Sequence, residues 1–215
     1  MPRVLRVTEI FHSIQGESTH AGRPCVFIRL TGCNLRCVWC DTAYAFHGGS
    51  AMSVDDVLER VAGHGCRLVE LTGGEPLLQP EAIGLMAALV ERGYEVLIET
   101  GGSLPIEPVP AGVKRIVDVK CPGSGEVARN RWENLDALRP GDELKFVLAD
   151  RADYDWAVGE IGRRGLAGRY PVLFSPVHGC LAPEELAGWV LRDRLAVRVQ
   201  LQLHKLLWPE ALRGV

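Results

Sequence analysis

Three cysteines close together in one loop are the side chains of this chain best suited to chemistry. Cys33, Cys37 and Cys40 follow an apolar, strand-like run at the spacing C-x3-C-x2-C. A [4Fe–4S] cluster normally takes four thiolates, so three cysteines leave one iron free to bind a small molecule. A structural zinc ion is instead closed by four ligands, usually from paired C-x2-C or spaced histidine units, and neither follows here. The loop therefore predicts a cluster with one open iron, with a zinc-stabilised, non-catalytic binding module as the alternative from another class.

This loop resembles the cluster loop of the radical S-adenosylmethionine (SAM) superfamily, in which SAM binds the open iron. Within the superfamily, C-N-L-x-C-x-W-C-D-T at residues 33–42 is similar to the 7-carboxy-7-deazaguanine synthase family. Three further segments match that family: E-I-F-x-S-I-Q-G-E at 9–17, L-T-G-G-E-P at 71–76 and L-Q-x-H-K at 201–205. The resemblance therefore extends from residue 9 to the low 200s.

The resemblance implies a lyase that converts 6-carboxy-5,6,7,8-tetrahydropterin to 7-carboxy-7-deazaguanine with loss of ammonia, in queuosine (7-deazapurine) biosynthesis. It implies three cofactors, namely a [4Fe–4S] cluster, SAM that is regenerated in each cycle, and Mg2+. The implied partners are the small pterin substrate, an electron donor such as a flavodoxin or ferredoxin, and a second copy of the chain in a homodimer.

Two features depart from the family pattern, and one other radical enzyme is a rival. Ser18 stands where the family often has Gly. Residues 209–215 continue past the last motif, so the sequence does not assign the contacts that this tail makes with the substrate. An activating enzyme for a glycyl-radical protein is also a short chain with C-x3-C-x2-C. That alternative leaves the Q-G-E motif at 15–17 and the D-T motif at 41–42 unexplained.

The resemblance also implies which residues hold each ligand. The cluster is implied to bind Cys33, Cys37 and Cys40, and Mg2+ to bind Thr42. The implied SAM-binding residues lie in turns and at strand ends: Trp39, Gly73, Gly74, Glu75, Glu99, Lys120, Ser175, Pro176, Val177 and His178. The implied substrate-binding residues are Ile14, Gln15, Gly16, Glu17, Arg29, Thr72 and His204. No side chain is assigned as catalytic, because SAM carries the radical.

Composition limits the partners that the chain can have. Its 215 residues fit one domain, 1–215, and 24 Lys and Arg against 27 Asp and Glu give a net charge of −3. A domain that grips RNA normally shows a basic face, so we expect no direct nucleic-acid contact. No apolar run approaches the ~20 residues of a membrane span, and residues 1–9 lack the apolar stretch of a signal peptide, so we expect a cytoplasmic protein without a membrane partner. Seven cysteines fit a reducing compartment, and those outside the loop are expected to be buried: Cys25, Cys66, Cys121 and Cys180.

Apolar strand-like runs alternate with helix-like segments from residue 25 onward, a pattern that favours parallel βαβ units. The expected strands are 25–31, 67–72, 94–99, 114–120, 143–148, 171–175 and 196–203. The expected helices are a capping-box helix from Ser53 to a Gly63/Gly65 stop, and 80–93, 130–138, 151–164 and 183–193. Six or seven such units are too few for a full eight-stranded barrel. We therefore expect an α/β fold, an open partial (β/α)6 barrel of the radical SAM type in which helices can be reduced.

Chemistry in such barrels gathers at the C-terminal ends of the strands. The marked residues follow this rule, because each ends or follows an expected strand: Cys33, Gly73, Glu99, Lys120, Ser175 and His204. These independent motifs on one rim predict a single active site.

For some of these residues, residue type and position alone indicate a role, without the family resemblance. Arg29 lies in an otherwise apolar run and is hard to bury unpaired, so we expect it to face the barrel interior and meet an anion. The hydroxyl of Thr42 suits a hard ion such as Mg2+, although a lone Thr here is also typical of a turn or helix cap. Gly73 and Gly74 allow a backbone to approach a ligand closely. Without the family match, His204 is equally typical of a structural histidine.

Overall fold

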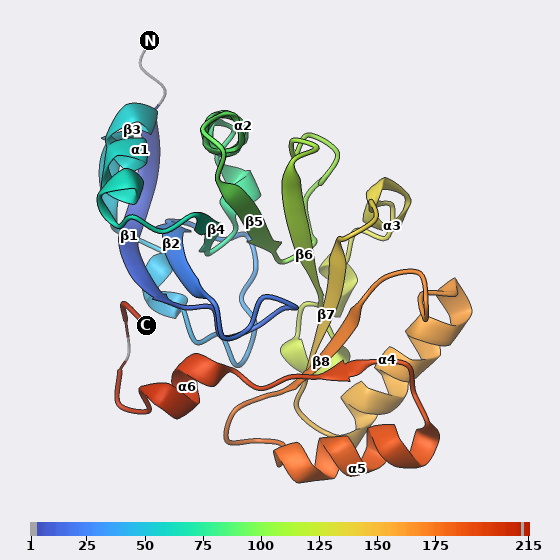
Figure 1. Cartoon of the computed structure of the whole chain (residues 1–215). Coiled ribbons are helices and arrows are strands. Elements are labelled where there is room, and N and C mark those ends of the chain that lie inside the picture. The colour runs from blue at the N-terminus through green and yellow to red at the C-terminus, as the bar shows by residue number, and fades with distance from the viewer. Residues whose placement is uncertain (1–3, 212) are drawn as a thin grey trace.

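The computed structural model describes residues 4–211 and 213–215 and contains one nine-stranded sheet (Figure 1). The strand order is β3-β1-β2-β4-β5-β6-β7-β8-β9. The strands are β1 (Val4–Ile14), β2 (Pro24–Leu30), β3 (Ser50–Ser53), β4 (Leu68–Gly73), β5 (Glu95–Thr100), β6 (Val113–Val119), β7 (Glu143–Leu148), β8 (Val172–Pro176) and β9 (Arg198–Val199).

Not every pair of consecutive parallel strands is joined by a full helix, as it would be in a closed (β/α)8 barrel. The α-helices are α1 (Val54–Gly63), α2 (Glu81–Glu91), α3 (Asn134–Ala137), α4 (Arg151–Arg164), α5 (Pro183–Asp193) and α6 (Leu203–Leu207). Short 3-10 turns are η1 (Ala43–Ala45), η2 (Pro76–Leu78), η3 (Pro122–Ser124) and η4 (Val127–Arg129). Within the described chain, no helix joins β5 to β6, and the connection from β6 to β7 holds only the turns η3 and η4 and the four-residue α3.

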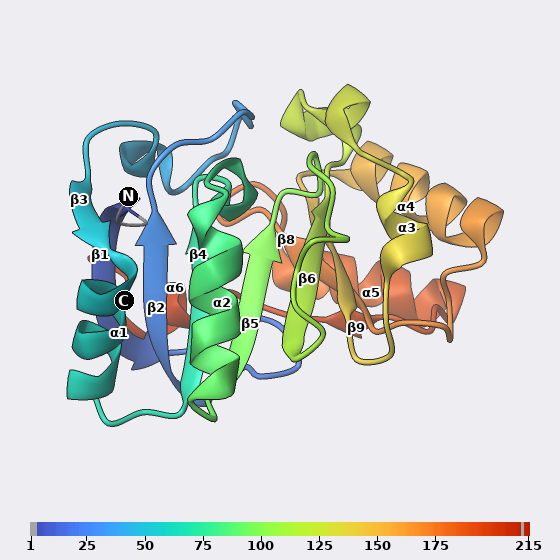
Figure 2. The ribbon, with the colours of Figure 1, turned by 90° about the horizontal axis from the view of Figure 1, so that it is seen from above.

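The parallel strands form the predicted partial barrel. Strands β2 and β4 to β8 run parallel to one another, and the short β9 continues the parallel order. The sheet curves, with α1, α2, α4 and α5 along its outer side (Figures 1 and 2). This arrangement confirms the expectation of an open (β/α)6 barrel with reduced helices, and it leaves the C-terminal ends of the parallel strands on one side.

Local sequence signals set several helix boundaries as expected. The side chain of Ser53 accepts a hydrogen bond from the backbone N–H of Asp56, whose carboxylate accepts from the backbone of Ser53, so the predicted capping box starts α1. The bounds of α4 and α5 coincide with the predicted helices at 151–164 and 183–193. The predicted helix at 130–138 is reduced to α3.

The two edges of the sheet differ from the expectation. The antiparallel strands β1 and β3 were not predicted, because polar residues interrupt the apolar pattern in 4–14 and β3 is a four-residue edge strand. Of the predicted strand 196–203, only β9 forms, and His204 lies in α6 rather than at a strand end. The reason is that the chain turns after β9 toward the N-terminal loop, where the N–H of Leu203 donates to the carbonyl of Gly16 at 3.1 Å.

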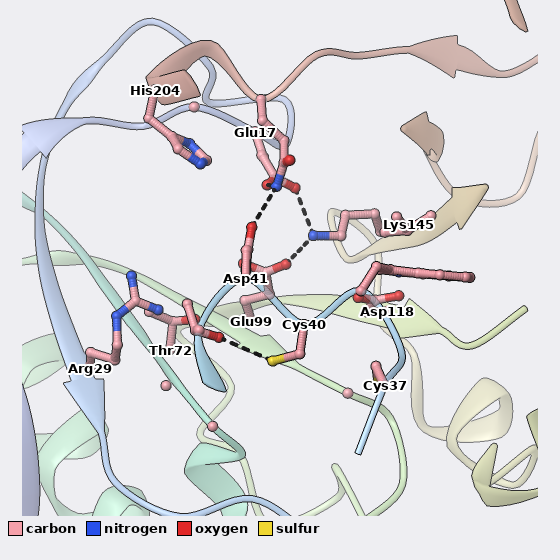
Figure 3. A pocket seen from close by; sticks show the side chains of 18 of the residues that line it. Glu17, Arg29, Cys37, Cys40, Asp41, Thr72, Glu99, Asp118, Lys145 and His204 are labelled. Carbon is pink, nitrogen blue, oxygen red and sulfur yellow. Dashed lines mark hydrogen bonds and ion pairs between the residues drawn. The ribbon is translucent and has the colours of Figure 1, made fainter. Parts of the chain in front are cut away.

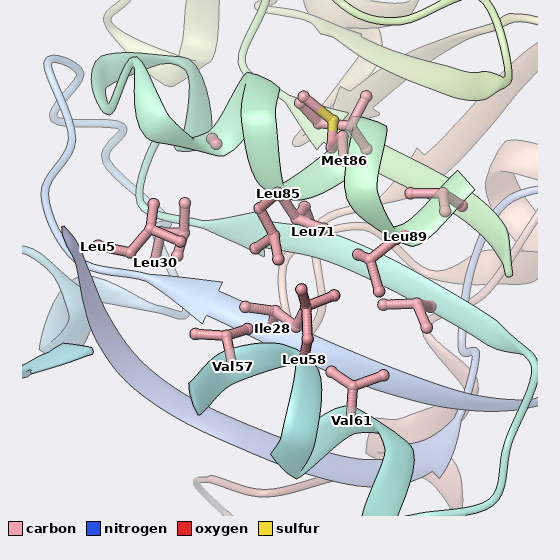
Figure 4. Close-up of a cluster of buried hydrophobic side chains, with 14 of the residues drawn as sticks. Leu5, Ile28, Leu30, Val57, Leu58, Val61, Leu71, Leu85, Met86 and Leu89 are labelled. Carbon is pink, nitrogen blue, oxygen red and sulfur yellow. The ribbon is translucent and has the colours of Figure 1, made fainter. Parts of the chain in front are cut away.

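Alternation along the strands separates an outer core from a barrel interior. On the outer face, side chains of β1, β2 and β4 pack against α1 and α2, as Figure 4 shows for Ile28, Leu71, Leu58 and Leu85. A second outer core packs β6 to β8 against α4 and α5. The alternate residues of the strands face the other side of the sheet, and a smaller buried cluster of them fills the bottom of the barrel interior: Cys25, Phe27, Leu68, Leu97 and Ile116. The residues two positions further along these strands lie on the same face, are polar and line the site, as Arg29, Glu70 and Glu99 do.

The four cysteines outside the loop do not all behave as predicted. Cys25 and Cys121 are buried, but Cys66 is only partly buried. The expectation is wrong for Cys180, which is exposed in the loop after β8 and lines the cavity described below. Among the described residues, no helix is both long enough and apolar enough to cross a membrane.

Candidate active site

A cavity of about 530 Å³ opens at the C-terminal ends of the parallel strands. The predicted residues that line it are Ile14, Gln15, Gly16, Glu17, Arg29, Cys33, Cys37, Trp39, Cys40, Thr42, Thr72, Gly73, Gly74, Glu99, Lys120, Val177, His178 and His204. Parallel strands place their C-terminal ends at one edge of a sheet, so residues far apart in sequence meet there. The structure thus brings the expected cluster, SAM and substrate residues together around one space.

Three predicted SAM-binding residues lie behind the wall of the cavity rather than along it. Glu75 is fully buried, and its carboxylate accepts hydrogen bonds from the hydroxyl of Thr100 at 2.9 Å and the N–H of Gly101 at 2.8 Å. Ser175 is buried and its hydroxyl accepts from the side chain of Gln200 at 2.9 Å, while Pro176 is buried beside it. These residues support the loops around the site.

The Gly73-Gly74 turn lets two backbones touch at the base of the cysteine loop. A Cβ on Gly74 would lie 2.1 Å from the carbonyl oxygen of Gly32, and a Cβ on Gly73 would lie 2.4 Å from that of Leu30. The N–H of Glu75 donates to the carbonyl of Gly32 at 2.7 Å. The glycines therefore fix the position of the cysteine loop relative to β4, in addition to the close approach to a ligand that the sequence suggested.

The donor set at the cysteine loop fits an iron–sulfur cluster. All three sulfurs line the cavity, and burial raises the pKa of the Cys33 and Cys37 thiols in the absence of metal. Thr42 lies beside them, with its Oγ1 3.7 Å from the Sγ of Cys40. Soft thiolates suit iron, and the hard oxygen of Thr42 suits Mg2+, so the two kinds of ligand are adjacent but chemically distinct.

An ion-paired layer forms the opposite wall. Lys145 of β7 donates to Glu17 at 2.6 Å and also to Glu99, and Figure 3 shows these three side chains pointing toward one another. Burial alone would raise the pKa of Glu17, but the Lys145 charge and the hydrogen bonds from Lys145 and Gln202 hold it below its ordinary value. Burial also acts to lower the pKa of Lys145, yet the two carboxylates raise it well above its ordinary value. Lys145 is therefore a fixed cation in the wall.

Arg29 faces the cavity, as the sequence predicted. Its Nε donates to Glu9 of β1 at 2.7 Å, and the hydroxyl of Tyr44 donates to the same oxygen of Glu9 at 2.7 Å. Burial, with Glu9 adding to it, raises the pKa of Tyr44 to about 12, so the phenol stays a donor. The anion that pairs with Arg29 in the protein is therefore Glu9, and the guanidinium still borders the cavity.

Lys120 and Asp118 provide the polar groups beside the cysteine loop. Lys120 donates to Asp118 at 2.7 Å. Burial works against the charge of Lys120, but Asp118 and Cys37 raise its pKa above the ordinary value. The other oxygen of Asp118, Oδ1, is buried without a hydrogen-bond partner among the described residues. A buried acceptor that borders the cavity fits a ligand rich in hydroxyl and amino donors, as SAM is.

His204 reaches the cavity from α6 rather than from a strand. A Cβ on Gly16 would lie 2.4 Å from Nδ1 of His204, so only glycine at position 16 lets the imidazole pack there. Burial lowers the pKa of His204, which keeps the ring neutral near pH 7. Next to it, Lys205 pairs with Asp41 at 2.9 Å, and this pair ties α6 to the loop that carries the cysteines.

Several cavity residues were missed by the sequence analysis: Asp41, Glu70, Asp118, Lys145, Gln202 and Lys205. Glu70 carries the signal that identified Arg29, because it is the single charge of its strand, whereas the strands of Lys145 and Asp118 hold further charged residues. Burying an unpaired charge is unfavourable, so such positions point to a polar interior. Gln202 and Lys205 were signalled only by the family motif at 201–205, because their positions depend on the turn after β9.

This fold and site define a radical SAM enzyme, a partial parallel barrel with three cysteines of C-x3-C-x2-C spacing on its cavity. Consistent with this class, the model of the Radical SAM superfamily matches residues 27–119. Proteins named 7-carboxy-7-deazaguanine synthase from Koribacter versatilis and Chlorobaculum tepidum are each 49% identical to this chain over 98% of its length, covering 100% and 97% of the relatives. The chain belongs to the 7-carboxy-7-deazaguanine synthase family.

The similarity to solved structures agrees at the level of the fold. A crystal structure of QueE from Escherichia coli superposes with a TM-score of 0.76 at 22% identity, covering 93% of this chain and 94% of that one. A [4Fe–4S] cluster and SAM are the cofactors of the superfamily, and the residues of the cavity fit both.

Proposed function

We propose that this chain converts 6-carboxy-5,6,7,8-tetrahydropterin to 7-carboxy-7-deazaguanine with loss of ammonia. The observation that supports this most directly is one cavity with the three cysteines on one wall and the Glu17–Lys145–Glu99 network on the other. A pterin presents an edge of amide and amine donors that carboxylates can accept, and its carboxylate group matches a cation. Glu17 and Arg29, which both line the cavity, supply these two features.

The residues that would hold the cofactors follow from their positions on the cavity. Cys33, Cys37 and Cys40 would bind the cluster, and Lys120 with Asp118 would contact SAM. When bound, the cluster and SAM supply a radical that can remove a hydrogen atom from the substrate. Mg2+ would bind the hydroxyl of Thr42 and keep several of its waters.

The protein's own part is to bind, orient and shield the substrate. The paired charges of Glu17, Lys145 and Glu99 are fixed before substrate arrives, so little reorganisation is needed on binding. Neutral His204 and the Lys205–Asp41 pair bring α6 over the cavity, where they would exclude water from a reactive intermediate. We assign substrate contacts to Ile14, Gln15, Gly16, Glu17, Arg29, Thr72 and His204.

The proposal extends to organisation and partners. The chain would act as one domain over residues 1–215 on a small-molecule substrate. An electron donor such as a flavodoxin or ferredoxin would approach the cysteine loop, where the side chain of Val38 is 77% exposed. A homodimer is proposed as well, and exposed apolar side chains of α6 such as Leu206 and Leu207 are compatible with such a contact.

The direct test is product formation by the reconstituted protein. We expect that anaerobic chain with cluster, SAM, a reductant and Mg2+ converts 6-carboxytetrahydropterin to 7-carboxy-7-deazaguanine, identified by mass spectrometry. Absence of product, with cluster and SAM bound, would refute the proposal. A glycyl-radical activating enzyme would instead leave a protein radical on a partner, and a zinc module would take up no iron.

A further inference from the structure

Glu70 is a buried carboxylate at the floor of the cavity that the sequence analysis did not mark. It lies on β4 two residues before Thr72, so both face the barrel interior. In the sheet it is in register with Phe27 of β2 and Leu97 of β5, two members of the apolar cluster at the bottom of the barrel. Glu70 is 2% exposed and borders the cavity. It therefore stands where the apolar interior meets the polar wall.

The contact that Glu70 makes is with the side chain of Gln15. Nε2 of Gln15 donates to Oε2 of Glu70, while Oε1 of Gln15 accepts from the N–H of Glu17 at 3.0 Å. The backbone of Gln15 is itself held, because its N–H donates to the carbonyl of Arg23 and its carbonyl accepts from Gly22, each at 2.8 Å. The side-chain amide of Gln15 lies between an acceptor, the carboxyl group of Glu70, and a donor, the N–H of Glu17. These two partners allow the amide only one orientation.

This orientation bears on the ion-paired wall. Glu17 follows Gln15 by two residues, and its carboxylate accepts from Lys145 at 2.6 Å and from Gln202 at 2.8 Å. If the amide of Gln15 turned, the N–H of Glu17 would lose its acceptor and the loop that carries the carboxylate would shift. A chain of hydrogen bonds therefore runs from Glu70 through Gln15 to Glu17.

We propose that Glu70 is a positioning residue for substrate binding, which acts by fixing the amide of Gln15 and, through it, the loop that carries Glu17. The inference rests on the proposed function, because it assigns a role within the same site. Glu70 would affect the affinity for the pterin more than the chemical step, since its link runs to the substrate wall and not to the cysteine loop.

The charges around Glu70 indicate the form in which it acts. The groups near it are Gln15 and Glu17 of the N-terminal loop, Glu99 of β5, Lys145 of β7 and the thiol of Cys25 on β2. Burial and the charges of Glu99 and Glu17 raise the pKa of Glu70 well above its ordinary value, and Lys145 is already paired with the other two carboxylates. A neutral carboxyl group still accepts a hydrogen bond through its carbonyl oxygen, so glutamine should replace Glu70 well.

The test compares Glu70→Gln, Glu70→Leu, Gln15→Leu and the Glu70→Leu/Gln15→Leu double variant in cluster-loaded protein with SAM. The dissociation constant of 6-carboxytetrahydropterin is measured anaerobically by calorimetry, and kcat and KM are measured alongside. Loss of a buried hydrogen-bond partner corresponds to roughly a 5- to 100-fold weaker affinity. We expect a loss in this range for both leucine variants, with KM affected more than kcat, and near-parent affinity for Glu70→Gln. The double variant should be no worse than Gln15→Leu alone, because both changes break one chain of contacts.

Controls separate this role from a structural one. Ile116→Val shortens a buried side chain of the apolar cluster in the same interior, and it should leave the affinity unchanged. Thermal unfolding reports whether each variant folds, and Glu70→Met, which keeps an unbranched side chain without an acceptor, replaces Glu70→Leu if that variant does not fold. Parent-like affinity in the folded Glu70→Leu or Glu70→Met variant would overturn the inference. So would additive losses in the double variant, or an equal loss in Ile116→Val. Parent protein that does not bind the pterin at all would instead overturn the proposed function.

Discussion

Lys145 and Glu17 are separated by 128 residues in sequence, yet Nζ of Lys145 lies 2.6 Å from Oε2 of Glu17. The contact joins β7 to the loop after β1, so one wall of the cavity forms only when the sheet between them is assembled. Lys145 also holds Glu99 of β5, and its side chain is only 6% exposed. A single ammonium group thus supports two carboxylates of the candidate site.

Replacement of Lys145 should destabilise the fold as well as the site. Lys145→Met leaves two buried carboxylates without their cation, and removal of one partner of a buried ion pair costs about 3–5 kcal/mol. The control is Lys205→Met, which breaks an ion pair with Asp41, whose side chain is 44% exposed, so a loss below about 1 kcal/mol is expected. Urea unfolding of the metal-free proteins measures both changes, and equal stability of the two variants would contradict the central role of Lys145.

The three cysteines of the loop should hold the cluster, and the other cysteines should not. After anaerobic reconstitution, we expect about four irons per chain in the parent and a clear loss in Cys33→Ala, Cys37→Ala and Cys40→Ala. Cys180→Ala is the sharpest control, because Cys180 borders the same cavity. Iron analysis and visible absorbance provide the measurement. Full iron in Cys37→Ala, or loss of iron in Cys180→Ala, would show that the ligand set is wrong.

Thr42 should contribute through Mg2+ and not through folding or cluster assembly. Thr42→Val keeps the shape but removes the hydroxyl oxygen, so it should retain iron and SAM binding. Its apparent Mg2+ affinity should fall by about tenfold or more, as for other changes to groups that support a metal. Thr42→Ser should keep most of the Mg2+ stimulation. If Thr42→Val responds to Mg2+ as the parent does, Thr42 is a turn residue and other groups hold the ion.

The raised pKa of Glu70 predicts a pH-dependent effect on stability. Above its ordinary pKa of 4.5, Glu70 loses its proton in the unfolded chain but keeps it in the folded protein. The folded state then binds more protons, so the parent loses stability as the pH rises through this window. Glu70→Gln has no proton to lose, and its stability relative to the parent should increase by on the order of 1 kcal/mol per pH unit. Denaturant unfolding from pH 4.5 to 8 measures this, and a constant difference would contradict the assignment.

Much of the fold was readable from local sequence because local physics decides it. The Ser53 and Asp56 capping box and the Pro183 start of α5 each act within one helical turn. The alternation of apolar runs and helical segments predicted the parallel barrel. The edge strands β1 and β3 were missed, because their stability comes from pairing with each other and with β2 rather than from an apolar pattern of their own.

The sequence by itself determined the cysteine loop, the glycine turn and the inward place of Arg29, because spacing and residue type carry that information directly. Tertiary structure alone decided that Lys145 pairs with Glu17, that Glu70 holds Gln15, and that His204 enters from α6. These contacts join segments at least 55 residues apart in the sequence, and they form only where burial removes water and makes pairing of each charge necessary. A motif can specify which groups a site contains, but the packed barrel decides which of them meet.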